Sequence, residues 1–143
     1  MTERGPIRIL IADDFKALRD VIRLYVEQAA DMKIIGESPH LDEALQEAIS
    51  LVPDVIIVND NLPPVDSAVA AALFRERGIP ARIVAISMEA EPDLIHRSLH
   101  SGVDGFMHKD EIDKYLVHAI RCVHRGEQYL SPKARAAYEG MEK

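Results

Sequence analysis

Short polar side chains follow four apolar runs of this sequence, each at the point where the run stops. These residues are Asp13-Asp14, Asn59-Asp60, Ser87 and Lys109. Two adjacent carboxylates that face a further oxygen are the ligands that a hard cation such as Mg²⁺ prefers. A hydroxyl and a lysine beside them can stabilise the oxygens of a phosphoryl group. The residue types therefore indicate cation and phosphoryl chemistry, provided that the fold brings them together.

Five apolar runs alternate with five stretches of helical periodicity along the chain. The predicted strands are 7–12, 32–36, 55–58, 83–86 and 105–108. The predicted helices begin near Phe15, Leu41, Asp66, Glu91 and Glu111, with Asp14 as the expected N-cap of the first. Such an alternation is typical of a parallel sheet with helices on both faces. We therefore predict an α/β protein, a single doubly wound (βα)5 flavodoxin-like domain whose parallel five-stranded sheet has the order 2-1-3-4-5.

This topology predicts one shared site, because the carboxyl ends of parallel strands meet at the same edge of a sheet. The third predicted strand is apolar without alternation from Val55 to Val58, as expected for a central strand buried on both faces. Asn59 and Asp60 follow it directly. Polar residues that are far apart in the sequence are thus expected to lie close together at this edge.

Composition and charge exclude several classes of function. The formal net charge of −7 over 143 residues argues against binding to a nucleic-acid backbone. The sequence has neither an apolar segment of membrane-spanning length nor a signal-type N-terminus. Cys122 is the single cysteine, which fits a reducing compartment. We therefore expect a cytoplasmic protein that binds neither a membrane nor nucleic acid directly.

A family resemblance emerges when these residues are taken together with their neighbours. The matching residues are Asp13-Asp14, Pro53-Asp54, Pro63, Asp66, Ser87, Gly102 to Phe106 and Lys109. In their joint spacing the chain resembles the receiver domain of two-component response regulators, over roughly residues 7–126. Residues 119–132 resemble the NarL/FixJ subfamily, in which a DNA-binding helix-turn-helix usually follows. The resemblance implies a signalling module and not an enzyme.

The resemblance also implies roles for individual residues. Those implied to hold Mg²⁺ are Asp13, Asp14 and the backbone carbonyl of Asn61. Ser87 and Lys109 match the residues that contact the phosphoryl group, and Phe106 matches an aromatic switch residue, with a packed core phenylalanine as the equal alternative. The implied partner is a histidine kinase or another signalling protein. A homodimer is expected either through the fourth helix, fifth strand and fifth helix or through the first and fifth helices.

The family pattern fails at its central position. The phosphorylated aspartate of receivers stands four residues before Pro63 and seven before Asp66, and both counts lead to Asn59. An amide is a poor nucleophile, because its lone pair is delocalised and no stable acyl phosphate results. We therefore expect the usual phosphorylation to be absent and Mg²⁺ binding to be weakened by the loss of a charged ligand.

Asp60 is the alternative phosphoacceptor. Successive side chains of a strand point to opposite faces, so Asp60 is expected to point away from the site that Asn59 faces. Asp60 reaches that site only if the strand has already ended or contains a bulge.

The leading hypothesis is a receiver module that acts through protein–protein contacts without the usual phosphorylation. The alternative is an ordinary phospho-accepting receiver of a DNA-binding transcriptional regulator, either truncated or carrying an engineered Asp-to-Asn exchange. A flavin binder is disfavoured because Asp13-Asp14 repels phosphate, and an aspartyl phosphohydrolase because residues 59–61 lack the paired aspartates. Residues 1–126 form the predicted receiver, and 127–143 a C-terminal tail or a truncated linker to an absent output domain.

Overall fold

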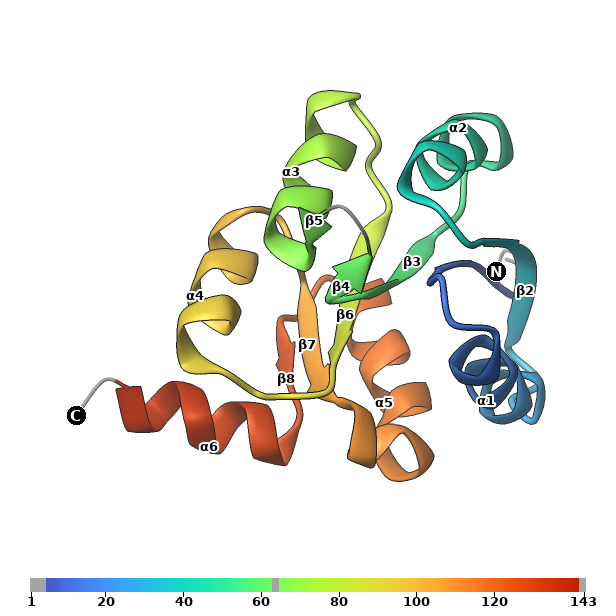
Figure 1. Ribbon diagram of the computed structural model, residues 1–143. Helices are drawn as coiled ribbons and strands as arrows, with labels where there is room; N and C mark the ends of the chain where they lie inside the picture. Colours follow the sequence, from blue (N-terminus) through green and yellow to red (C-terminus); the bar gives the residue numbers. More distant parts are fainter. Residues whose placement is uncertain (1–4, 63–64, 142–143) are drawn as a thin grey trace.

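A parallel sheet organises the computed structural model, which describes residues 5–62 and 65–141 (Figure 1). Its strands are β1 (Ile7–Ala12), β2 (Met32–Ser38), β3 (Val55–Asn59), β6 (Arg82–Ser87), β7 (Gly105–His108) and β8 (Tyr129–Leu130). The helices are α1 (Lys16–Glu27), α2 (Leu41–Leu51), α3 (Ser67–Glu76), α4 (Pro92–His100), the 3-10 turn η1 (Lys109–Glu111), α5 (Ile112–His124) and α6 (Pro132–Met141). Two short antiparallel strands, β4 (Asn61–Leu62) and β5 (Val65–Asp66), form a separate ladder. Pro63, on which the family registration partly rests, lies outside the described residues.

The order of the main sheet is β2-β1-β3-β6-β7-β8. The predicted flavodoxin-like order is confirmed for the first five of these strands, and every pair in the sheet is parallel. The difference is a sixth strand, β8, which pairs with β7 through Tyr129 and Leu130. Two residues carry too little periodicity to be recognised as a strand from the sequence.

Each face of the sheet is covered by its own set of helices, because strand residues alternate between the two faces. Ile9 and Ile57 pack in the cluster formed with α1 and α5. Leu10 and Ile56 pack in the opposite cluster, with α2, α3 and α4. Ile56 and Ile57 are both almost fully buried, which confirms that β3 is a central strand.

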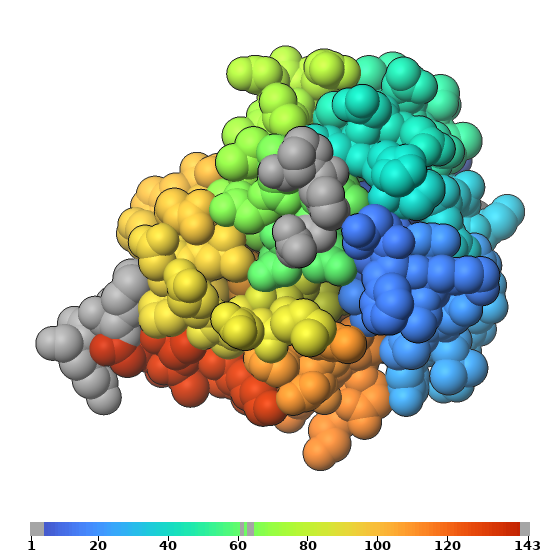
Figure 2. Space-filling view, in the orientation of Figure 1, coloured from blue at the N-terminus to red at the C-terminus, as the bar shows by residue number. Residues whose placement is uncertain are grey.

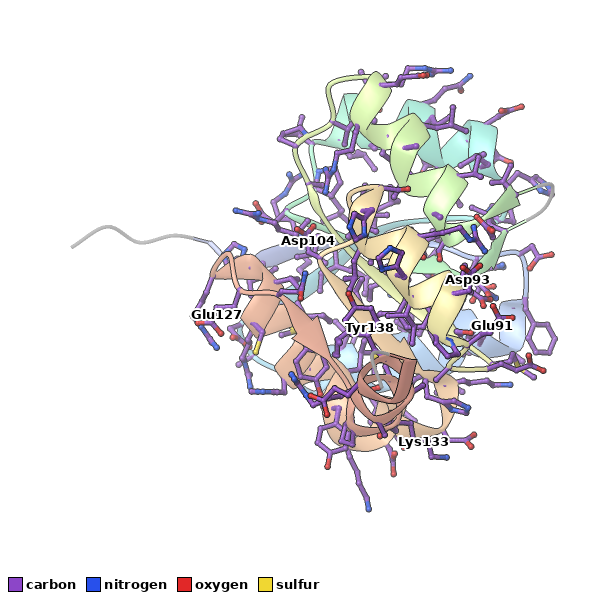
Figure 3. All side chains as sticks on the ribbon, turned by 90° about the vertical axis from the view of Figure 1, so that its left-hand side faces the viewer. Glu91, Asp93, Asp104, Glu127, Lys133 and Tyr138 are labelled. Carbon is purple, nitrogen blue, oxygen red and sulfur yellow. The ribbon has the colours of Figure 1, made fainter. Side chains whose placement is uncertain are left out.

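The segment after α5 continues the same core. Leu130 of β8 and Ala134 of α6 are buried in the cluster that contains α4 and Phe106. Figures 1 and 3 show α6 next to α4 and roughly crosswise to it, with Tyr138 between the two helices. The Tyr138 ring stacks on His96 with centroids 6.3 Å apart. The expected boundary at residue 126 stays a prediction, but residues 129–138 contribute a strand, a helix and buried side chains to this fold.

The connection from α4 to β7 depends on one glycine and one aspartate. Gly102 adopts a φ of +115°, and a Cβ there would lie 2.8 Å from Nε of Arg75. The Asp104 carboxylate accepts hydrogen bonds from the Ile83 amide at 2.8 Å and from Arg75 Nη2 at 3.1 Å. The segment Gly102 to Phe106 is therefore held against β6, which fixes the start of β7 and, with it, the position of Lys109.

The helices of the described residues are short or amphipathic. None of those between residues 5 and 141 has both the length and the apolar composition needed to cross a membrane.

Candidate functional site

Asp13 lies just after β1 and is the most buried of the predicted site carboxylates, with 1% of its surface exposed. Its Oδ1 accepts hydrogen bonds from the Phe15 amide at 2.9 Å and from Asn59 Nδ2 at 3.0 Å. Its Oδ2 is buried and has no hydrogen-bond partner among the described residues. A buried carboxylate oxygen without a partner costs free energy, so this atom is a candidate ligand for a cation or a water.

The electrostatic setting of Asp13 points the same way. Burial raises the pKa of the Asp13 carboxyl above its ordinary value of 3.8, and the nearby Asp14 charge raises it further. The hydrogen bonds from Asn59 and Phe15 lower the pKa but do not cancel the effect of burial. The folded protein therefore holds this group as an anion only at a cost, which a bound cation would offset.

Asp14 is exposed and does not cap α1 as predicted. The residue before the helix is Phe15, which makes no side-chain capping bond, and the Phe15 amide is bonded by Asp13 instead. The N-cap assignment was therefore wrong, because the preceding aspartate reaches the same donor. No hydrogen bond or ion pair in the described part of the chain engages the Asp14 carboxylate, so it remains available at this edge.

Asn59 is the last residue of β3 and is half-buried. Its amide nitrogen donates to Asp13 Oδ1, which brings the ends of β1 and β3 together as the topology predicted. An amide donor satisfies one lone pair of the Asp13 carboxylate, whereas a carboxylate at this position would repel it. Asn59 thus stabilises the cluster in the absence of a cation.

Asp60 does not point away from the site as strand alternation predicted. The strand ends at Asn59, and although the Asp60 amide still donates to the Ile86 carbonyl at 2.8 Å, its carboxylate turns to Ser87. Asp60 Oδ2 accepts a hydrogen bond from Ser87 Oγ at 2.6 Å. Burial raises the pKa of Asp60 above its ordinary value, the Ser87 bond opposes this shift, and the charges of Asp66 and Glu89 add to it.

Ser87 is the last residue of β6 and is fully buried. Besides the bond to Asp60, its Oγ accepts a hydrogen bond from the Glu89 amide at 3.0 Å and contacts the Glu89 carbonyl. The hydroxyl therefore joins the end of β3 to the first residues of the loop that leads to α4. The predicted strand-end position of Ser87 is confirmed, and Glu89 is a neighbour that no sequence pattern predicts.

Lys109 begins η1, immediately after β7. Its Nζ lies 3.5 Å from Sδ of Met88, and within the described residues no carboxylate lies within ion-pair distance of it. Phe106 is fully buried among residues of α4 and α6, so its side chain is packed inward. Its proposed switching remains a prediction.

Figure 2 shows that the four strand ends share one face of the molecule. The blue segment after β1, the green segment after β3, the yellow segment after β6 and the orange segment after β7 adjoin there. Hydrogen bonds join Asn59 to Asp13 and Ser87 to Asp60. Lys109 contacts Met88, the residue that follows Ser87 in the chain. The residues fit Mg²⁺ on one observation, the buried and unpartnered Oδ2 of Asp13 beside the exposed Asp14. The described residues contain no group of three or more His, Cys, Asp or Glu that could hold a metal, so any cation here must also use neutral oxygens.

The sequence of this chain is similar to that of a known domain family and of several curated proteins. The profile of the response regulator receiver domain matches residues 9–121. The nitrate/nitrite response regulator protein NarL of Escherichia coli (strain K12) is 29% identical over 131 residues, covering 92% of this chain and 61% of that protein. The oxygen regulatory protein NreC of Staphylococcus carnosus is 28% identical over 128 residues, covering 89% and 59%. The chain thus spans about three fifths of the length of these curated relatives.

Solved structures share the fold. A LuxR-family two-component response regulator from Aurantimonas matches with a TM-score of 0.91 at 22% identity, covering 96% of this chain and 99% of that chain. The signal receiver domain of NarL from Mycobacterium tuberculosis matches with a TM-score of 0.74 at 26% identity, covering 82% and 98%. Because the receiver profile spans well over half of the sequence, the chain belongs to the response regulator receiver domain family of two-component signalling.

Proposed function

We propose that this chain is a receiver module that does not take up a phosphoryl group on β3 in the usual way and that signals through protein–protein contacts. The observation that supports the proposal is the amide of Asn59, which lies at the end of β3 and donates to Asp13. An amide offers no oxygen of carboxylate nucleophilicity, so no acyl phosphate forms on it. The module would therefore regulate a partner without acting as an enzyme.

In this proposal Mg²⁺ is a weak ligand of the acidic edge. Asp13 through Oδ2, Asp14 and the backbone carbonyl of Asn61 would hold it, and the cation would supply charge neutralisation for nearby oxygens. Asn59 keeps Asp13 Oδ1 satisfied, and Lys109 and Ser87 are the predicted contacts of any phosphoryl oxygen. With one carboxylate fewer than an aspartyl receiver, the site would bind the cation less tightly.

The expected partner is a histidine kinase or another signalling protein, and one of the two expected homodimer surfaces is favoured. The edge of β7 is paired with β8, and α4 packs against α6, which together cover the fourth-helix surface. The first helix instead exposes Val21 and Leu24, and the residue before it, Phe15, is also exposed. These apolar side chains support an interface through α1 and α5. The net charge of −7 supports contact with protein and not with nucleic acid.

A second candidate function is an ordinary phospho-accepting receiver within a DNA-binding regulator. The length of the relatives favours it, since this chain spans only about three fifths of them. The proximity of Asp60 to Ser87 also favours it, because a strand-end carboxylate then lies beside a predicted phosphoryl contact. The buried Cys122 supports a reducing, cytoplasmic setting for either function.

Mass spectrometry after incubation with Mg²⁺ and acetyl phosphate separates these functions. We expect no acid-labile phosphate adduct on the unmodified chain and an adduct on Asn59→Asp. An adduct on the unmodified chain that disappears in Asp60→Asn would overturn the proposal and identify Asp60 as the acceptor. Lack of an adduct on Asn59→Asp would contradict the Mg²⁺ and phosphoryl roles given to Asp13, Ser87 and Lys109.

A further inference from the structure

The pairing of Asp60 with Ser87 is the polar contact of this edge that the family resemblance does not account for. We propose that the Asp60 carboxylate takes the place of a phosphoryl oxygen toward Ser87, so that the chain holds its own β6–α4 loop in a ligand-bound arrangement. This inference rests on the proposed function, in which Ser87 is the hydroxyl that would otherwise contact a phosphoryl group. Asp60 is thus a positioning residue that acts through Ser87.

The geometry of the contact supports this role. The Ser87 hydroxyl is fully buried, and Asp60 Oδ2 lies 2.6 Å from its oxygen. Hydrogen bonds from hydroxyl groups to anionic oxygens are short and stronger than those between neutral groups. Carboxylate and phosphoryl oxygens are alike in this respect, since both are anionic acceptors. The Asp60 amide is tied to the Ile86 carbonyl at 2.8 Å, so the backbone that carries the carboxylate is fixed against β6.

The contact extends to α4 through the loop that follows Ser87. Ser87 Oγ accepts from the Glu89 amide at 3.0 Å, which holds the first turn of the loop. The helix α4 begins three residues later, and its Ser98 shares a buried hydrogen bond of 2.9 Å with Ser67 of α3. A side chain that fixes Ser87 therefore also restrains the approach to α4, the element on which α6 packs (Figure 3).

The same contact disfavours an external phosphoryl group. Such a group would have to displace Asp60 from Ser87, and it would carry its own negative charge to within reach of the Asp60 carboxylate. Asp66 and Glu89 already act on Asp60 as like charges. The edge therefore disfavours a phosphoryl group in two ways: the amide at Asn59 removes the acceptor, and the carboxylate at Asp60 competes for Ser87 and can still be displaced.

Amide hydrogen exchange of residues 88–100 in a double-mutant cycle tests the mechanical part of the proposal. We expect Asp60→Ala and Ser87→Ala each to speed exchange in α4 by about tenfold, and the double variant to add little, because one charged hydrogen bond is lost in each case. Asp60→Asn retains an acceptor oxygen and serves as the matched control, with most of the protection kept. Peptides from α2 report whether the whole domain has been destabilised.

Unchanged exchange in Asp60→Ala, or effects that add in the double variant, would overturn the proposal. Exchange that rises equally in α2 and α4 would also overturn it, because Asp60 would then stabilise the fold as a whole.

Beryllium fluoride with Mg²⁺ tests whether the carboxylate replaces a phosphoryl oxygen. In the double variant Asn59→Asp/Asp60→Ala, we expect the beryllium fluoride complex to bind, as detected by ¹⁹F NMR. Its binding should return the amide exchange of α4 to the rate of the unmodified chain. Bound fluoride with α4 still exchanging fast would overturn the surrogate role. If no fluoride binds, the phosphoryl roles under the proposed function fail, while the mutant cycle above still decides whether Asp60 positions the loop.

Discussion

Two buried carboxylates lie after two different strands of this sheet, Asp13 after β1 and Glu111 after β7, and their surroundings differ. Glu111 of η1 is 8% exposed, and both its oxygens accept from the Lys133 amide, at 3.1 and 3.3 Å, where α6 begins. Asp13 is 1% exposed, and its Oδ2 has no partner within the described residues. One carboxylate is bonded through both oxygens to the start of a helix, while the other retains an oxygen without a partner among the described residues.

These surroundings distinguish a carboxylate that stabilises the fold from one that is available to a ligand. A buried charge that is fully hydrogen-bonded stabilises the fold, because removal of either partner leaves the other unsatisfied. A buried charge with an open acceptor destabilises the fold until something binds. Substitution of Glu111 and of Asp13 should therefore shift stability in opposite directions, and the following experiments measure this contrast.

The largest effect is expected from Asn59→Asp, which adds a second carboxylate beside Asp13. Two unit charges about 5 Å apart at an effective dielectric near 20 repel by about 3 kcal/mol, so we expect the free energy of unfolding in EDTA to fall by about this amount. Mg²⁺ should restore much of the loss. Urea denaturation at neutral pH measures both, with Gln46→Glu on the exposed side of α2 as the control for an added charge. An unchanged or raised stability of Asn59→Asp in EDTA would contradict the electrostatic account of Asp13.

Glu111→Ala should be the next largest change. Loss of the carboxylate at the start of α6 removes a charged cap, so the free energy of unfolding should fall by about 2 kcal/mol and α6 should exchange its amides faster. Glu111→Gln keeps an acceptor and should lose less. Asp110→Ala, which breaks an exposed pair with Lys133 and a longer contact with His108, should leave the free energy of unfolding almost unchanged. Equal losses in Asp110→Ala and Glu111→Ala would show that the cap is not what holds α6.

Asp13→Asn should act in the opposite direction. Because burial raises the pKa of Asp13, the folded state disfavours its charged form at neutral pH, and removal of the charge should raise the free energy of unfolding in EDTA by about 1 kcal/mol. The same variant should lose the stabilisation that Mg²⁺ gives. Asp14→Asn, at an exposed position, should change stability in EDTA by less than about 0.5 kcal/mol. A loss of stability in Asp13→Asn would place Asp13 in the same class as Glu111.

A further effect is confined to the alkaline range and concerns Tyr129 of β8. Burial, with the Glu111 charge as the second cause, raises the pKa of Tyr129 to about 12 from its ordinary value of 10.0. The folded state then binds more protons than the unfolded state between these values, so stability present below pH 10 is lost as the pH rises. Between pH 10 and about pH 11 the loss should be about 1 kcal/mol. Tyr129→Phe should abolish this loss in alkaline urea titrations, and Glu111→Gln should lower the pKa of Tyr129. The tyrosinate absorbance that is missing from Tyr129→Phe reports this ring, and a midpoint near pH 10 for it would contradict the burial of Tyr129.

Five strands and the shared strand-end edge could be predicted because they depend on long apolar runs and on topology alone. The unbroken run of β3 and its two buried faces agree, and Asp13, Asn59 and Ser87 stand at strand ends as expected. These features follow from patterns that extend over several residues, so a single side chain does not change them.

The remaining features depend on where one or two residues point. Asp60 was expected to face away by strand alternation, but β3 ends at Asn59 and the Asp60 carboxylate bonds Ser87. Asp14 was the expected cap of α1, but Asp13 takes the Phe15 amide. The hydrogen bond from the Lys133 amide to Glu111 joins residues that are 22 positions apart, and no local sequence pattern predicts it. Strand boundaries and long-range side-chain pairs are set by tertiary packing, which a single sequence does not display.

The two-residue strand β8 has a consequence for the behaviour of the protein in concentrated solution. An unpaired strand at the border of a sheet offers a row of free amides and carbonyls with which another molecule can pair. Here β8 pairs with the outer edge of β7. The next element in the chain, α6, packs against α4. The segment from Tyr129 onward thus protects β7 from edge-to-edge aggregation, and proteolytic removal of that segment would expose a template for it.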